Sequence, residues 1–195
     1  PGANKFTSHI QVTSESLETA KIVVSQMEVN AEEVEQLFFN SKAKNCLNIL
    51  NLAPFKKPSK KLVAHTDVLV FNELEFSLFA SLDTSSPVEV DILKEKLENQ
   101  NLSNKLALIV TLGERGLVYY ENNKMDYIEA EKVNAVDTVG SGDCFVGALS
   151  YSLLNGKSLK DSCEFANKSA ALSVTRKGAA TSMPKIEEVR SSFKL

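Results

Sequence analysis

Residues 136–149 read VDTVGSGDCFVGAL, and they are the most informative stretch of the chain. Gly140 and Gly142 permit a tight turn, and their missing side chains let a ligand approach the backbone. A helix is expected to begin near Asp143, so the amides of residues 140–143 would point outward at a helix N-terminus, where the helix dipole favours anions. Taken alone, the segment is equally well interpreted as an ordinary loop in which Asp143 caps the helix.

Two better-known glycine motifs are absent from the chain. The third glycine of the dinucleotide-binding pattern GxGxxG would fall on Phe145, and the P-loop pattern GxxxxGK[ST] occurs nowhere. The segment therefore predicts an anion-binding turn of another kind.

Strand and helix patterns alternate along the remaining sequence. Short apolar runs predict strands at 21–27, 46–51, 68–71 and 106–111, and a hairpin that pairs 117–120 with 125–128. Helical periodicity predicts helices at 31–41, 73–82, 88–97, 143–154, 159–174 and 186–193. This alternation predicts an α/β fold with a mainly parallel sheet covered on both faces, in which ligands bind beyond the carboxyl ends of the strands.

The charge balance excludes several classes of protein. The chain has 195 residues, with 22 Lys and Arg against 25 Asp and Glu, which gives a formal net charge of −3. A nucleic-acid or membrane-surface protein normally shows a basic face, and no apolar run approaches the roughly 18 residues of a membrane span. Neither a nucleic acid nor a membrane is therefore expected as a partner.

Cysteine and histidine are too sparse for several kinds of site. Cys46, Cys144 and Cys163 form no close pair, so neither a zinc site nor a disulfide framework is expected, and three reduced thiols are typical of a cytosolic protein. His9 and His65 are the only histidines, which argues against a histidine-based triad. Catalysis would then rest on carboxylates, backbone amides and cations.

Four motifs together resemble those of one enzyme family. DTVGSGD at 137–143 resembles the signature D-T-x-G-A-G-D, with Ser141 in place of alanine. NELE at 72–75 resembles N-x-x-E, TLGERG at 111–116 resembles the nucleotide loop T-L-G-x-x-G, and 167–178 resembles the helix and loop over the adenine. These are motifs of the ribokinase-like carbohydrate kinases, the phosphofructokinase-B family. They occur in family order over nearly the whole chain, and they imply a ribokinase-like three-layer α/β/α fold truncated at its N-terminus.

The resemblance implies ATP-dependent phosphorylation of a sugar hydroxyl. Asp143 would be the general base, and the amides of Gly140, Ser141 and Gly142 would stabilise the developing charge. The residues implied to bind ATP are Asn72, Thr111, Leu112, Gly113, Glu114, Arg115, Gly116, Gly142, Asp143 and Asn167. An isolated N-x-x-E is more often a solvated surface pair, and Asn167 alone is more often a helix-surface amide.

Two cation sites are also implied by the resemblance. Glu75 would hold Mg²⁺ through water, because Mg²⁺ gives up its waters reluctantly. A monovalent-cation site, expected to take K⁺, would use Asp137, Val139, Ser173, Arg176, Gly178 and Ser182. From the residues alone, an Asp137 that caps a loop or pairs with Arg176 is an equally good interpretation.

Three weaker segments resemble the ribokinase branch of the family. They are PGAN at 1–4, Glu28, and NLAP at 51–54, in which Leu52 departs from N-P-A-P. The expected sugar is therefore D-ribose, bound by Glu28 and Asp143. A fructose or adenosine kinase and a non-catalytic nucleotide-binding fragment are the alternatives.

The resemblance also implies how the chain is organised. Residues 1–195 would be the C-terminal catalytic and nucleotide-binding part of a single domain that lacks the N-terminal sugar-binding and lid region. The full-length protein is expected to be a homodimer through that lid, in the cytoplasm or also the nucleus. The 195 residues alone are expected to have low or no activity.

Overall fold

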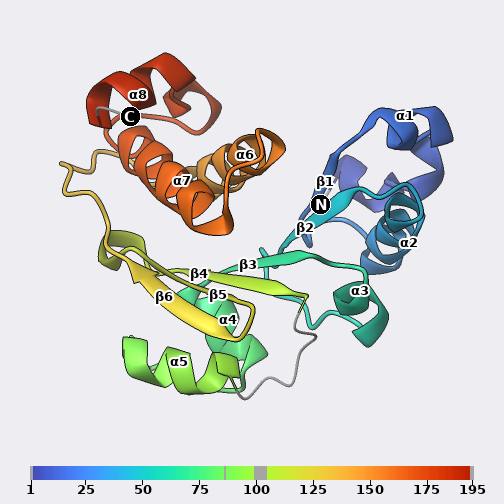
Figure 1. Cartoon of the computed structure of the whole chain (residues 1–195), viewed down its shortest axis with the longest axis horizontal. Coiled ribbons are helices and arrows are strands. Elements are labelled where there is room, and N and C mark those ends of the chain that lie inside the picture. The colour runs from blue at the N-terminus through green and yellow to red at the C-terminus, as the bar shows by residue number, and fades with distance from the viewer. Residues whose placement is uncertain (1, 86, 99–104, 194–195) are drawn as a thin grey trace. The chain divides into compact units, whose positions relative to one another are not determined.

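The structure, a computed structural model, describes residues 2–85, 87–98 and 105–193 (Figure 1). It divides into two compact units. The N-terminal unit comprises Pro1–Thr111 and Tyr120–Met125, and the C-terminal unit comprises Leu112–Tyr119 and Asp126–Leu195. Each is described by itself.

Four parallel strands form the centre of the N-terminal unit. They are β1 (Ile22–Ser25), β2 (Leu47–Asn51), β3 (Val68–Asn72) and β4 (Ala107–Thr111). The register pairs Val24 with Ile49, Leu50 with Leu69, and Val70 with Ile109. The hydrogen-bonded order continues through β5 (Leu117–Glu121) and β6 (Lys124–Ile128), which form the predicted hairpin. Most residues of β2, β3 and β4 are buried on consecutive positions, as in strands covered on both faces.

Helices precede and connect these strands. They are η1 (Gly2–Phe6), η2 (His9–Gln11), α1 (Ser14–Thr19), α2 (Ala31–Lys42), α3 (Lys60–Ala64), α4 (Glu73–Phe79) and α5 (Val90–Glu98). Polar side chains cap several of them: Asn30 accepts a hydrogen bond from the Glu32 amide, and Ser59 accepts one from the Leu62 amide. The core of the unit includes Phe38, Phe71 and Phe76, all fully buried.

Two long helices dominate the C-terminal unit. They are α6 (Ser141–Leu154) and α7 (Leu159–Ser173), which pack against each other. The unit also contains η3 (Gly113–Arg115), η4 (Ala180–Ser182) and α8 (Ile186–Phe193). Leu149 of α6 and Cys163 and Ala166 of α7 are fully buried. No helix within the described ranges has both the length and the apolar character needed to cross a membrane.

The predicted α/β class is confirmed, each predicted strand is present along the chain, and the differences lie mainly at element ends. Helix α6 begins at Ser141, two residues before the predicted start, because Gly140 takes a left-handed conformation (φ 78°) and serves as the N-cap. Helix α4 ends at Phe79 rather than at residue 82, and Ser81 is left-handed (φ 57°). The short helices α1 and α3 were not predicted, because five or six residues carry too little periodicity.

Candidate active site

The N-terminus of α6 has the backbone geometry of an anion site. The Ser141 amide donates to the Thr138 carbonyl (3.2 Å), and the Cys144 amide donates to the Gly140 carbonyl (2.9 Å). The amides of Gly142 and Asp143, which lie between these two, donate to no hydrogen-bond acceptor within the described part of the chain. Both residues are exposed, and a side-chain carbon built on Gly142 would meet no atom within 4 Å. Two free amides and one carboxylate therefore face open space at the positive end of a helix.

The carboxylate of Asp137 organises the loop before this turn. Its Oδ2 accepts from the Gly178 amide (2.8 Å) and its Oδ1 from the Val139 amide (3.0 Å). These two donors hold the pKa of Asp137 below its ordinary value, with Gly178 the larger cause. The amides of Val136 and Asp137 donate in turn to the Val174 carbonyl (2.7 and 3.1 Å). The loop that precedes α6 is thus tied to the loop that follows α7.

Gly140 fits this junction because of its small size. A side-chain carbon there would lie 3.2 Å from the Cα and Cβ of Ala179. The close approach and the left-handed backbone both favour glycine. Ala179 was not predicted as part of the site, since nothing in the local sequence marks it as a neighbour of Gly140.

The residues expected at the monovalent-cation site divide into two groups. Asp137, Val139 and Gly178 are brought together by the hydrogen bonds above. Ser173 and Ser182 are buried and donate to carbonyls one turn back, both at 2.8 Å. Arg176 forms an ion pair with Glu188 (2.8 Å), which also lowers the pKa of Glu188. Of the two alternative roles of Asp137, the structure thus shows the loop cap and not the pair with Arg176.

The two predicted cation sites differ from a metal site built from clustered side chains. Among the residues that the structure describes, no group of three or more His, Cys, Asp and Glu side chains could hold a metal ion. The donors available near Asp137 are one carboxylate and backbone oxygens, which are hard ligands suited to K⁺ or Mg²⁺. The donor chemistry therefore fits an oxygen-ligated cation.

The nucleotide loop, defined here as residues 112–116, is a tight turn in the C-terminal unit. The Leu112 amide donates to the Gly116 carbonyl (2.8 Å), and the Gly116 amide donates to the Gly113 carbonyl (3.0 Å). Both glycines are left-handed, with φ 59° at Gly113 and 95° at Gly116. The Leu112 side chain is buried, so only its backbone can face a ligand, whereas Glu114 is exposed and Arg115 half-exposed.

Two other residues predicted to bind the nucleotide make defined contacts. Thr111, which belongs to the N-terminal unit, donates through its hydroxyl to the Phe71 carbonyl (3.2 Å). Asn167 of α7 donates through Nδ2 to the Glu129 carbonyl (2.8 Å). Asn167 is thus more than a free surface amide, because it joins α7 to the end of β6.

Asn72 and Glu75 form a reciprocal cap at the start of α4. The Glu75 amide donates to Asn72 Oδ1 (2.8 Å), and the Asn72 amide donates to Glu75 Oε2 (2.7 Å). Glu75 is only 7% exposed, and burial raises the pKa of its carboxyl above the ordinary value. Glu75 is therefore not a solvated surface residue, whereas Asn72 is exposed. A buried carboxylate of this kind would be stabilised by a cation held nearby through water.

Replacing Glu75 by Gln separates its structural role from its charge. Gln keeps the acceptor for the Asn72 amide, so helix α4 should still be capped. In the wild type, a raised pKa means that stability falls as pH rises through the pKa of the folded state, and Glu75→Gln should abolish that fall. We expect the variant to unfold at the same or a higher temperature than wild type at pH 7.

Glu73→Gln is the matched control for this substitution. Glu73 lies in the same first turn, and its Oε1 accepts from the Val88 amide (2.5 Å). Thermal melts between pH 4 and 8 measure both variants. At each pH, the melting temperature of Glu75→Gln is compared with that of wild type. If this difference is less favourable to the variant at pH 7 than at pH 4, the charge argument is contradicted.

The N-terminal segment brings Asn4 to Glu28, with Asn4 Nδ2 donating to Glu28 Oε2 (3.1 Å). Glu33 of α2 holds this segment in place. Its Oε2 accepts from the His9 amide (2.7 Å), the Ser8 hydroxyl (2.8 Å) and His9 Nδ1 (2.7 Å), which lowers the pKa of Glu33 to about 2. Glu28 itself is exposed after β1, where a sugar could reach it. Pro1 lies outside the described residues, so only part of the predicted PGAN segment can be placed.

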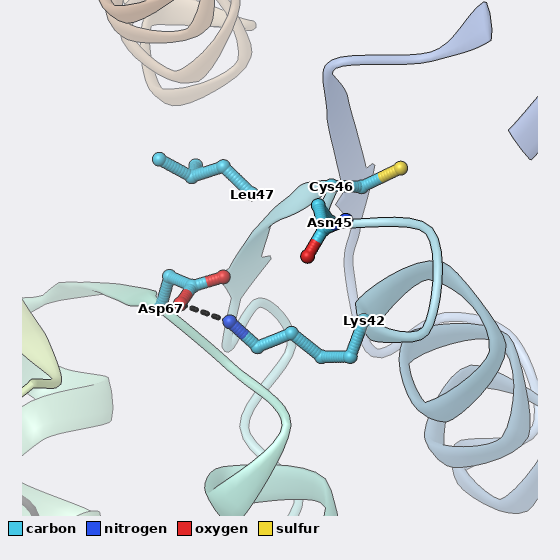
Figure 2. A pocket seen from close by; sticks show the side chains of 5 residues that line it. All are labelled: Lys42, Asn45, Cys46, Leu47 and Asp67. Carbon is cyan, nitrogen blue, oxygen red and sulfur yellow. Dashed lines mark hydrogen bonds and ion pairs between the residues drawn. The ribbon is translucent and has the colours of Figure 1, made fainter. Parts of the chain in front are cut away.

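Figure 2 shows a cavity of about 320 Å³ in the N-terminal unit, lined by Lys42, Asn45, Cys46, Leu47 and Asp67. Lys42 and Asp67 form an ion pair, and Asp67 also accepts from the Asn48 amide (2.8 Å). The cavity lies where β2 and β3 begin, whereas the predicted site residues follow strand ends. Its charged groups therefore serve to join α2 to the sheet.

A second cavity of about 320 Å³ lies in the C-terminal unit. The residues that line it include Asp143, Gly147 and Tyr151 of α6, Phe165 and Ser169 of α7, and Met183, Pro184, Ile186 and Val189. Apart from Asp143, few of its lining groups are polar. Sequence periodicity could not reveal it, because it depends on how α6, α7 and α8 pack.

Comparison with known proteins now tests the resemblance inferred from the motifs. Residues 1–186 match the sequence profile described as pfkB family carbohydrate kinase. The chain belongs to this family. A ribokinase of Schizosaccharomyces pombe is 35% identical over 195 residues, which cover 98% of the chain and 61% of that relative.

Solved structures agree with this family membership. The crystal structure of a Thermotoga maritima ribokinase matches with a TM-score of 0.84 at 28% identity, over 99% of the chain and 63% of that protein. An Arabidopsis thaliana ribokinase in complex with ribose and ATP matches with a TM-score of 0.83 at 25% identity, over 93% of the chain and 58% of that protein. The predicted ribokinase-like fold is therefore confirmed. The chain spans about three-fifths of the length of these relatives.

Proposed function

We propose that the complete protein is an ATP-dependent carbohydrate kinase that converts D-ribose and ATP to D-ribose 5-phosphate and ADP. The proposal rests chiefly on the N-terminus of α6, where the free amides of Gly142 and Asp143 adjoin the Asp143 carboxylate. The choice of ribose is supported by the relatives, several of which are ribokinases, one of them in complex with ribose and ATP.

Asp143 is the proposed general base. It would accept the proton of the attacking sugar hydroxyl, a contribution worth about 10²- to 10⁴-fold in rate. The amides of Gly140, Ser141 and Gly142 are proposed to stabilise the negative charge that develops during phosphoryl transfer. Gly142 is the most open to solvent of the three, whereas the Ser141 amide would first have to release the Thr138 carbonyl (3.2 Å). Base and amides come from consecutive residues, so their mutual geometry is fixed by the helix itself.

The residues predicted from the motifs to bind the nucleotide and its cations keep these roles in the proposal. The nucleotide loop, Asn72, Thr111 and Asn167 would bind ATP. Glu75 would hold Mg²⁺ through water, and the cation neutralises phosphate charge when bound. K⁺ would lie with Asp137, Val139, Ser173, Arg176, Gly178 and Ser182, where it would help to order the loop before α6. Glu28, with Asn4 bound to it, would contact a sugar hydroxyl.

A substrate screen tests this proposal. The complete protein, supplied with ATP and Mg²⁺, is tested for ADP release with D-ribose, 2-deoxy-D-ribose, D-fructose and adenosine. We expect kcat/KM to be highest for D-ribose, by about tenfold or more over each of the others, because a site built to bind hydroxyls rejects analogues that leave its polar groups unpaired. The 195-residue chain alone should show little turnover.

Two results would contradict the proposal at different levels. A higher kcat/KM for fructose or adenosine would overturn the choice of sugar and leave a carbohydrate kinase. Nucleotide binding without ADP release for any sugar would favour a non-catalytic nucleotide-binding protein.

A further inference from the structure

Tyr127 makes a contact with the nucleotide loop that the sequence did not predict. It is the penultimate residue of β6, and its hydroxyl donates a hydrogen bond to the carbonyl of Arg115. The Tyr127 side chain remains substantially exposed (39%), so the residue does not belong to the hydrophobic core. The Tyr127 hydroxyl is thus hydrogen-bonded to the loop, although the side chain lies at the surface.

The bond reaches the loop from outside, at a carbonyl that the loop's own turn does not use. The internal bonds of the loop run from Leu112 to Gly116, from Gly116 to Gly113, and from the Arg115 amide to the Leu112 carbonyl (3.2 Å). These bonds close a one-turn structure of five residues, and a single turn of this length is marginal without support. The Tyr127 hydroxyl, which donates to the Arg115 carbonyl, supplies such support.

The residues after Tyr127 extend this connection to α7. A side-chain carbon on Gly116 would lie 2.0 Å from the Ile128 carbonyl oxygen, so the loop and the end of β6 touch through their backbones. One residue further, the Glu129 carbonyl accepts from Asn167 Nδ2 (2.8 Å). Residues 127–129 therefore connect two elements that are both proposed to bind the nucleotide.

We propose that Tyr127 is a positioning residue for the nucleotide loop, and that it acts on ATP binding through the Arg115 carbonyl. This inference rests on the proposed function. Without the bond, the loop would spend more time in conformations that do not bind ATP. The apparent dissociation constant for ATP rises in inverse proportion to the fraction of molecules whose loop remains competent to bind. The chemical step and sugar binding should be insensitive to it, because Asp143 and Glu28 lie on other elements.

Tyr127→Phe tests the inference, and Tyr120→Phe is its matched control. Tyr120 belongs to the same hairpin, and its hydroxyl donates to Asn123 Oδ1 (3.0 Å) at the turn rather than to the nucleotide loop. Both variants lose one hydroxyl and keep the ring. In the complete protein we expect Tyr127→Phe to raise KM for ATP, and Kd for ADP, by about three- to tenfold. Its kcat and its KM for the sugar should stay within about twofold, and Tyr120→Phe should change none of these constants.

Hydrogen exchange of the loop provides a second measurement that needs no bound nucleotide. The hydrogen-bonded amides of Arg115 and Gly116 should exchange about three- to tenfold faster in Tyr127→Phe than in wild type and Tyr120→Phe. Thermal melts should place both variants within about 3 °C of wild type.

The outcomes separate this inference from the proposed function. Unchanged ATP and ADP constants with unchanged loop exchange would overturn the role of Tyr127. So would an equal rise in KM for ATP and for the sugar, because that pattern indicates a general loss of structure. A wild-type protein that binds no ATP would contradict the proposed function, and the exchange comparison would still decide whether Tyr127 positions the loop.

Discussion

Replacing Asp143 by Asn in the complete protein should lower kcat for D-ribose by about 10²- to 10⁴-fold while ATP binding is retained. Asn has nearly the same shape as Asp, but its amide cannot take up the proton of the sugar hydroxyl. Asp143 is exposed at the third position of α6, and within the described ranges its carboxylate has no hydrogen-bond partner. The substitution therefore removes the proposed base without removing a contact that holds the fold.

Asp161→Asn is a closely matched control for that experiment. Asp161 occupies the corresponding third position of α7, where its Oδ2 accepts from the Ser158 hydroxyl (2.8 Å). Both substitutions remove a carboxylate from the first turn of a long helix, at a cost of about 0.3–1 kcal/mol through the helix dipole. Only Asp143→Asn should lose turnover in a coupled ADP-release assay, with Kd for ATP measured by calorimetry. Normal turnover by Asp143→Asn would show that another group is the base.

Of the substitutions that we predict in the C-terminal unit, Gly116→Ala should destabilise the protein most. Gly116 has φ 95°, and an added side-chain carbon would lie 2.0 Å from the Ile128 carbonyl oxygen and 2.7 Å from the Ala130 amide nitrogen. Both neighbours are backbone atoms, so they cannot rotate away as a side chain could. We expect a loss of about 4 kcal/mol or more in the free energy of unfolding, together with loss of ATP binding, because the nucleotide loop must separate from the end of β6.

Gly147→Ala is the control for the added methyl group. Gly147 lies inside α6 with a helical backbone, and an added carbon would meet nothing within 4 Å. Alanine should therefore leave stability unchanged or raise it by up to about 1 kcal/mol. Urea or thermal unfolding of the two variants measures the difference. If Gly116→Ala has the same free energy of unfolding as wild type and binds ATP normally, the nucleotide loop does not pack on β6 as it does in the structure.

Several parts of the candidate site could be predicted from local sequence. The two glycines before Asp143 predicted a tight turn and a helix N-terminus, and the structure has a left-handed Gly140 at that cap. The helix predicted to begin at residue 73 does begin there, and Asn72 and Glu75 form a reciprocal cap at its start. Such features depend on backbone conformation over a few residues, which side-chain size, capping and periodicity largely determine.

Other parts could not be predicted, because they depend on which distant segments meet. The sequence left open whether Asp137 caps a loop or pairs with Arg176. In the structure, Asp137 accepts a hydrogen bond from the amide of Gly178, which is 41 residues away, and this contact makes it a loop cap. Nor could the sequence reveal that Glu75 is buried, or that the Tyr127 hydroxyl reaches the Arg115 carbonyl.

The sequence by itself thus determined the order of strands and helices, the α/β class, the family and the identity of the groups available for chemistry. Only the tertiary structure decided which of these groups are buried and which hydrogen bonds they make. The physical reason is that periodicity and turn preference are local properties of the chain. Burial and hydrogen-bond partnership, in contrast, arise only when segments far apart in the sequence pack together and exclude water.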